Sequence, residues 1–120
     1  MIDFKIERIV PLCQEFGIEL DNKKIEQLNT YGNLLLEWNE KINLTAIKDV
    51  DGVLYKHFFD CILFFKNVDV PQSASIVDVG TGAGFPGMVL KIVRPDLKVT
   101  LLDSLNKRLV FLNEVISSLN

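Results

Sequence analysis

A glycine-rich segment at residues 77–87, VDVGTGAGFPG, constrains the fold of this chain more than any other feature of its sequence. The segment begins within a short β-branched run, SIVDV, and leads into the helical pattern MVLKIVR. A second strand-like run, KVTLLD at residues 98–103, and a helix from about Leu105 follow. This order predicts a βαβα unit whose right-handed crossover makes the two strands parallel. We therefore expect an α/β fold containing part of a doubly wound sheet.

The first part of the chain has a helical pattern, with apolar residues recurring three or four positions apart. It predicts three helices, at about residues 3–16, at about residues 21–41 and from about residue 51. Asp21 is a suitable N-cap for the second of them. Turn-forming residues at 71–74, PQSA, then separate this helical part from the strands. We therefore expect a helical extension at residues 1–72 and a partial α/β domain at residues 73–120.

Composition narrows the classes of protein to which the chain can belong. Of its 120 residues, 48% are hydrophobic and 24% charged, which is typical of a globular chain. The net charge of −3 lacks the basic excess expected of a strong nucleic-acid binder. One histidine and two distant cysteines, Cys13 and Cys61, are too few for a structural zinc site, so we expect no metal. No apolar stretch suits a signal peptide or a spanning helix, and we expect a cytoplasmic location without membrane contact.

The glycine-rich loop is the candidate ligand-binding site. Glycines at a strand-to-helix turn let the backbone approach a ligand closely and present amide N–H groups at the start of a helix. Asp103 ends the second strand 23 positions after Gly80, where a carboxylate can accept both ribose hydroxyls of an adenosine-containing cofactor. The candidate cofactor-binding residues are Asp78, Gly80, Gly82, Gly84, Phe85, Asp103 and Ser104.

The glycine spacing by itself fits two cofactors. Gly82, Gly84 and Gly87 satisfy the GxGxxG pattern of NAD-binding oxidoreductases, which is weak evidence when it occurs alone. Two features favour S-adenosylmethionine (AdoMet) instead. One is the acidic residue Asp78, two positions before the first glycine, and the other is Pro86 at the start of the helix. A simpler interpretation also stays open at this point, in which the glycines serve turn geometry and Asp103 caps a helix.

Four segments carry a more specific signal, and in order and spacing they resemble one family. They are EWNEKINLT at 37–45, KHFFD at 56–60, the loop at 78–86 and LDSLNKR at 102–108. The chain resembles the glucose-inhibited division protein B family (RsmG), AdoMet-dependent methyltransferases of guanine N7 in 16S ribosomal RNA. The resemblance implies a helical extension packed on a Rossmann-like methyltransferase sheet, with AdoMet held by the loop and Asp103. It favours AdoMet over a dinucleotide and implies 16S ribosomal RNA or the small ribosomal subunit as partner.

The resemblance has further implications for activity. Guanine N7 carries a lone pair and no proton, so methylation needs alignment more than proton transfer, and we nominate no catalytic residue. At helical spacing among apolar residues, His57 is expected to be a hydrogen-bonded structural residue. Lys107 and Arg108 are candidate RNA-phosphate contacts, with a solvated helix face as the alternative.

Length is the main departure from the family, which continues past residue 120. We therefore expect a truncated sheet, no methylation by this chain alone, and self-association through an unpaired sheet edge. A non-catalytic fragment or binding module is the alternative function, and an NAD-dependent oxidoreductase is a further one.

Overall fold

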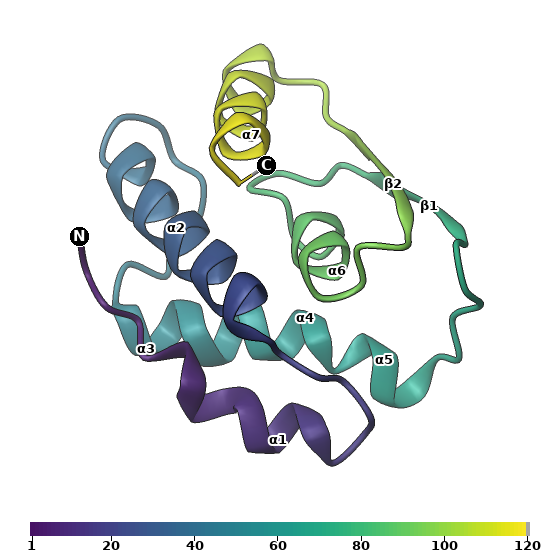
Figure 1. Cartoon of the computed structure of the whole chain (residues 1–120). Helices are drawn as coiled ribbons and strands as arrows, with labels where there is room; N and C mark the ends of the chain where they lie inside the picture. Colours follow the sequence, from purple (N-terminus) through teal and green to yellow (C-terminus); the bar gives the residue numbers. More distant parts are fainter. Residues whose placement is uncertain (120) are drawn as a thin grey trace.

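The computed structural model describes residues 1–119, and it is a mixed α/β structure as expected (Figure 1). Helices make up the first part of the chain, and a parallel pair of strands with two flanking helices makes up the second. The elements in chain order are η1 (Ile6–Ile9), α1 (Val10–Gln14), α2 (Asn22–Asn39), α3 (Val50–Gly52), η2 (Val53–Phe59), α4 (Asp60–Ile62), α5 (Phe64–Asn67), β1 (Ser75–Val79), α6 (Gly87–Val93), β2 (Lys98–Leu102) and α7 (Asn106–Leu119).

The βαβα unit has the topology that the sequence predicts. β1 and β2 pair in parallel, with Ser75 opposite Lys98 and Val79 opposite Leu102. α6 connects the strands and packs against both of them, and α2 packs against α6 and α7. The carboxyl ends of both strands therefore meet at one edge of the sheet, where the glycine-rich loop begins.

The predicted first helix is wrong at its start, because the chain before Ile6 is not helical. Lys5 has φ 53°, and the first turn, η1, is a 3-10 turn. Side chains of α2 explain this, since the Asn29 amide oxygen accepts a hydrogen bond from the Phe4 amide at 2.7 Å. The Asn33 amide oxygen accepts one from the Ile2 amide at 2.8 Å. These contacts hold the N-terminal segment extended along α2, with the Phe4 ring buried.

The second and third helices follow the sequence pattern with shifted ends. Asp21 caps α2 as predicted, its carboxylate accepting a hydrogen bond from the Lys24 amide at 2.9 Å. The third helix begins at Val50, one position earlier than expected, and Asp49 is its N-cap. It continues through a π-helical stretch, η2, which was not predicted from the apolar spacing.

One hydrophobic core joins the helical part to the loop, and its centre is a group of aromatic rings. Phe4, Tyr31 and Phe58 are fully buried and lie close together. The Tyr31 ring stacks on Phe58 with centroids 5.4 Å apart and lies 5.6 Å from the ring of Phe85 in the glycine-rich loop. The domain boundary at residue 72 stays a prediction, because residues on both sides of it share this core.

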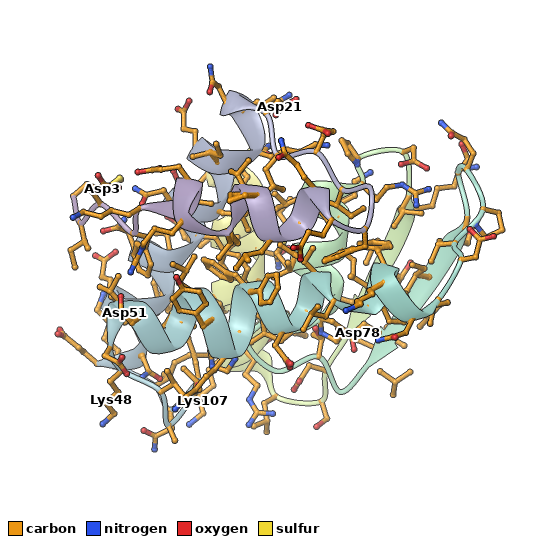
Figure 2. All side chains as sticks on the ribbon, turned by 90° about the horizontal axis from the view of Figure 1, so that it is seen from below. Asp3, Asp21, Lys48, Asp51, Asp78 and Lys107 are labelled. Carbon is orange, nitrogen blue, oxygen red and sulfur yellow. The ribbon has the colours of Figure 1, made fainter. Side chains whose placement is uncertain are left out.

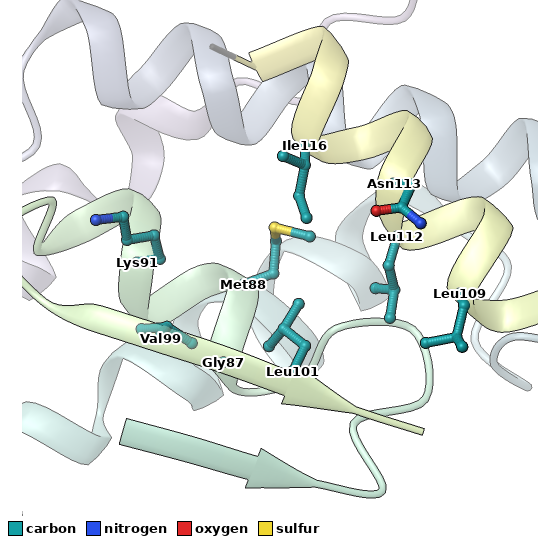
Figure 3. A pocket seen from close by; sticks show the side chains of 9 residues that line it. All are labelled: Gly87, Met88, Lys91, Val99, Leu101, Leu109, Leu112, Asn113 and Ile116. Carbon is teal, nitrogen blue, oxygen red and sulfur yellow. The ribbon is translucent and has the colours of Figure 1, made fainter. Parts of the chain in front are cut away.

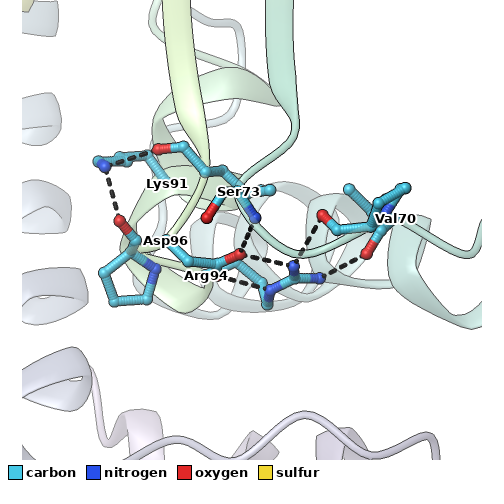
Figure 4. Close-up of polar contacts among 8 residues, drawn as sticks. Val70, Ser73, Lys91, Arg94 and Asp96 are labelled. Carbon is cyan, nitrogen blue, oxygen red and sulfur yellow. Dashed lines mark hydrogen bonds and ion pairs between the residues drawn. The ribbon is translucent and has the colours of Figure 1, made fainter.

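Polar contacts fix the junction between α5 and β1. The Arg94 guanidinium forms an ion pair with Asp96 at 2.8 Å (Figure 4). It also donates hydrogen bonds to the carbonyls of Val70 and Pro71. The Asp96 carboxylate in turn accepts a hydrogen bond from the Ser73 amide. The guanidinium and the amide hold the pKa of Asp96 well below its ordinary value. This cluster ties the end of the helical part to the turn after α6.

One face of the two-stranded sheet is exposed. Val77, Val79 and Leu102 are 59%, 77% and 47% exposed, whereas Val99 and Leu101 are partly covered by the helices. The exposed apolar positions of the sheet are therefore Val77 and Val79 on β1 and Leu102 at the end of β2. Each of the two strands also has one unpaired edge within residues 1–119.

We expect the chain to self-associate through this sheet, because exposed apolar strands with open edges pair with other chains. Light scattering should show a dimer or a larger species. Val79→Lys should shift it toward the monomer, and Val110→Lys on α7, where the valine is 49% exposed, should not. A monodisperse monomer at high concentration would contradict the prediction.

The described residues contain neither a candidate membrane-spanning helix nor a candidate metal cluster. Across residues 1–119 no helix combines the length and the apolar character that crossing a bilayer requires. Within the same range, no three histidine, cysteine, aspartate or glutamate side chains gather where a metal ion could bind.

Candidate cofactor-binding site

The glycine-rich loop, residues 80–86, leaves the end of β1 in a conformation that favours glycine. Gly80, Gly82 and Gly84 have φ of 71°, 61° and 101°. Residues with a Cβ atom rarely adopt such backbone angles. The loop backbone therefore depends on these three glycines.

The glycines differ in what surrounds them. A Cβ atom added to Gly80 or Gly82 would meet no atom within 4 Å. A Cβ at Gly84 would lie 2.5 Å from the Tyr31 hydroxyl, and one at Gly87 would collide with Leu101 and lie 2.9 Å from Asp78 Oδ2. Gly84 and Gly87 are thus required by packing within the chain. Gly80 and Gly82 instead leave bare backbone facing open space, as a site for a closely approaching ligand requires.

Four of the loop amides donate to carbonyl groups of the loop or of β2, so they are not directed at a ligand as the sequence suggested. The amides of Gly80 and Thr81 donate to the Leu102 carbonyl at 2.8 and 3.0 Å, and those of Gly84 and Phe85 donate to the Thr81 carbonyl. These amides have protein acceptors because the loop folds back on itself and on the end of β2. What the loop offers a ligand is close approach at the two open glycines.

Asp78 holds the loop in shape. Its Oδ2 accepts a hydrogen bond from the Thr81 hydroxyl at 2.6 Å and another from the Gly87 amide at 2.9 Å. Both ends of the loop are thereby fixed to one carboxylate at the fourth position of β1, which Figure 2 labels. A direct contact between Asp78 and a cofactor stays a prediction.

Asp103 links the loop to the start of α7. Its side chain is only 2% exposed, and its carboxylate accepts hydrogen bonds from the amides of Gly82 at 2.8 Å and Leu105 at 3.0 Å. These two amides, with a smaller contribution from Arg108 at 3.5 Å, hold the pKa of Asp103 below its ordinary value. The structure thus brings Gly82 and Asp103 together, as the sequence predicted. Asp103 also holds the turn before α7 through the Leu105 amide, which precedes the helix, so this bond is not an N-cap of α7, and Ser104 lies exposed beside it.

The two α7 residues predicted to contact RNA phosphate, Lys107 and Arg108, differ in their exposure. Lys107 is exposed, and in the view from below it lies along the same margin of the molecule as Lys48 (Figure 2). Arg108 is instead half-buried and faces the Asp103 carboxylate. Arg108 therefore has a partner within the chain, and its contact with RNA stays a prediction, as does that of Lys107.

Tyr31 supports the loop from the helical extension. Its hydroxyl donates to the Ala83 carbonyl, and its ring is fully buried. Burial raises the pKa of this phenol well above its ordinary value, so the hydroxyl keeps its proton. The apolar spacing of the helix predicted at about residues 21–41 gives Tyr31 no role beyond its place in that pattern. The one sequence signal for a supporting role was a hydroxyl group among apolar core positions, because a buried hydroxyl needs a hydrogen-bond partner.

We expect Tyr31→Phe to lower the free energy of unfolding by about 1–2 kcal/mol, since the buried Ala83 carbonyl loses its hydrogen bond. Urea denaturation measures the change. The matched control is Tyr55→Phe, because Tyr55 is 39% exposed, and it should change stability little. Equal stability of the two variants would contradict this role.

His57 is held between the helical extension and the loop. Its Nε2 lies 2.7 Å from the Thr45 hydroxyl, and its ring is nearly parallel to that of Phe85, with centroids 4.3 Å apart. Thr45 is positioned by Asn39, whose amide oxygen accepts from the Leu44 and Thr45 amides. The prediction of a hydrogen-bonded His57 is confirmed. These contacts join two of the segments that carry the family resemblance, 37–45 and 56–60.

We expect the His57 ring to titrate below pH 6.5. Burial lowers its pKa from 6.5, and Asp60 opposes part of the change. The neutral ring therefore contributes stability above pH 6.5 that is lost as the pH falls through the lower folded pKa. Proton NMR can follow this titration, because the sequence contains one histidine. A midpoint at or above 6.5 would contradict the prediction.

An apolar cavity of about 290 Å³ lies away from these residues, between α6, β2 and α7. Met88, Leu101, Leu112 and Ile116 converge on it (Figure 3). None of the seven candidate cofactor-binding residues lines it. The candidate site is therefore the open side of the loop at Gly80 and Gly82, next to Asp103.

A parallel βαβ unit with a glycine-rich turn after its first strand and a carboxylate after its second is typical of Rossmann-like enzymes that bind nucleoside cofactors. Comparison with known proteins gives a more specific result. A family model described as GidB, rRNA small subunit methyltransferase G, matches residues 24–120, and the chain belongs to this family.

Individual relatives agree with the family model. The chain is 50% identical over 107 residues to "Ribosomal RNA small subunit methyltransferase G" of Clostridium botulinum (strain ATCC 19397 / Type A), covering 89% of this chain and 45% of the relative. It is 52% identical over 115 residues to the protein of the same name from Staphylococcus carnosus (strain TM300), covering 96% and 48%. The chain thus spans about half the length of the curated relatives that it matches.

Proposed function

We propose that this chain carries the cofactor-binding part of an AdoMet-dependent methyltransferase that acts on guanine N7 of 16S ribosomal RNA in the cytoplasm. The observation that carries the proposal is the bare backbone of Gly80 and Gly82, which faces open space next to the nearly covered carboxylate of Asp103. Family membership and the printed names of the relatives support it.

The residues present fit this cofactor. A Cβ at Gly82 would enter the space that a ligand needs, and the Asp103 carboxylate retains lone pairs beyond those used by its two amide partners. We propose that Asp103 accepts hydrogen bonds from the ribose hydroxyls and that the open glycines contact the methionine part. Asp78 and Tyr31 act indirectly by holding the loop in shape.

The chemistry explains why no acid or base is needed. AdoMet, when bound, would supply a sulfonium methyl group as the electrophile for the lone pair of guanine N7, with the electrons of the C–S bond left on sulfur. N7 carries no proton to remove. The protein contributes alignment of the two reactants and exclusion of water.

Isothermal titration calorimetry of the chain with AdoMet and with NAD tests the cofactor. We expect saturable binding of AdoMet and none of NAD. Binding of NAD but not AdoMet would support an oxidoreductase and contradict the proposal.

A methylation assay tests the substrate and separates an enzyme from a binding module. Radiolabelled AdoMet is incubated with 16S ribosomal RNA and either the chain or a full-length relative. We expect label at guanine N7 with the relative and only background with the chain alone. Label at another base would contradict the assignment of the substrate.

A further inference from the structure

A groove of about 550 Å³ lies between the third helical segment and the end of the glycine-rich loop. Its volume is within the range of small-molecule sites, about 300–1,000 Å³. Two walls of different origin form it. The helical wall contributes Lys56, His57, Asp60 and Asn67, and the loop wall contributes Phe85 and Pro86.

The loop wall places the groove beside the candidate cofactor site. Phe85 and Pro86 directly follow Gly84, so an occupant of the groove contacts the same loop whose open glycines face the cofactor. The Phe85 ring is fixed by its stack on His57, with centroids 4.3 Å apart, and by its contact with the Tyr31 ring, 5.6 Å away. The groove therefore has a preorganised aromatic edge of the kind on which nucleic-acid bases stack.

The helical wall supplies polar groups that the fold does not use. Lys56 and Asp60 are exposed, and within residues 1–119 neither forms an ion pair. A lysine ammonium suits a phosphate group. A carboxylate can accept two parallel N–H bonds, which among the RNA bases guanine offers at its N1 and N2 atoms.

We propose that this groove binds the guanine nucleotide that is to be methylated. Asp60 accepts hydrogen bonds from guanine N1–H and N2–H, and Lys56 contacts the phosphate. In a purine, N7 lies on the edge opposite N1 and N2. With Asp60 holding that first edge at the helical wall, N7 faces the loop wall. This inference rests on the proposed function, because it assigns the second reactant of the same reaction.

The apolar cavities of the chain suit this role less well. The one between α6, β2 and α7 is lined mainly by aliphatic side chains, with Lys91 as its one charged residue. The groove at the loop combines a cation, a carboxylate and aromatic rings with residues of the glycine-rich loop.

The experiment uses the ring signals of His57, which lines the groove and is the one histidine of the sequence. The chain is saturated with S-adenosylhomocysteine, and guanosine 5′-monophosphate (GMP) is titrated at pH 7.5, where the lowered pKa keeps the ring neutral. We expect a saturable shift of the His57 signals with GMP and at least fivefold weaker binding of cytidine 5′-monophosphate. Asp60→Asn should weaken GMP binding at least fivefold.

The matched control is Asp69→Asn, an exposed aspartate outside the groove, which should bind GMP like the unaltered chain. If AdoMet binds by calorimetry but GMP leaves the His57 signals unchanged, or Asp60→Asn binds GMP normally, the inference is wrong and the proposed function stands. If S-adenosylhomocysteine moves the His57 signals and GMP then causes no further change, the groove holds the cofactor and the inference is also wrong. Failure of AdoMet itself to bind contradicts the proposed function instead.

Discussion

Gly82→Val is expected to weaken AdoMet binding at least tenfold without unfolding the chain. The φ of 61° at Gly82 disfavours valine, and we expect a stability cost of about 1–3 kcal/mol. No protein atom lies within 4 Å of the new Cβ, so the added methyl groups extend into the open space where we place the cofactor. Calorimetric titration with AdoMet measures the loss of affinity, and circular dichroism verifies the fold.

Gly17→Val is the matched control for this variant. Gly17 has φ 83°, and its Cβ would also meet nothing within 4 Å, but it follows α1, away from the loop. The two variants should lose similar stability, because both place valine at a positive φ. Only Gly82→Val should lose affinity for AdoMet. Unchanged affinity in Gly82→Val would mean that the loop is simply a turn.

Asp103→Ala is expected to weaken AdoMet binding at least tenfold and also to lower the melting temperature. The carboxylate accepts the amides of Gly82 and Leu105, so its removal loosens the loop and the start of α7 together. Ribose hydroxyls would at the same time lose a charged acceptor. Calorimetry and thermal melts measure the two effects separately.

Two comparisons separate the roles of Asp103. Asp103→Asn keeps a neutral oxygen acceptor, so it should retain more stability than Asp103→Ala while still losing affinity. An affinity within twofold of the unaltered chain in both variants would leave Asp103 with only the structural role of holding the Gly82 and Leu105 amides. Because the pKa of Asp103 is lowered from 3.8, its stabilising contribution should be present above pH 3.8 and disappear as the pH falls through the folded pKa.

Much of the fold followed from local patterns. The parallel βαβα unit, the cap at Asp21 and the long amphipathic helix α2 are determined by residues close together in the sequence. The start of the first helix was not, because Asn29 and Asn33 on α2 bind the backbone of the N-terminal segment. Hydrogen bonds between residues 25 and 31 positions apart override the local helix propensity there.

The sequence by itself determined the family, the strand order and the place of Asp103 next to the loop, since each depends on spacing along the chain. Only the tertiary structure decided what each glycine does. Gly84 and Gly87 face Tyr31 and Asp78, whereas Gly82 faces open space. The physical reason is that a spacing pattern specifies backbone conformation, while the surroundings of a Cβ position depend on helices that pack from elsewhere in the chain. For the same reason the groove between Asp60 and Phe85 appears only when the helical part folds against the loop.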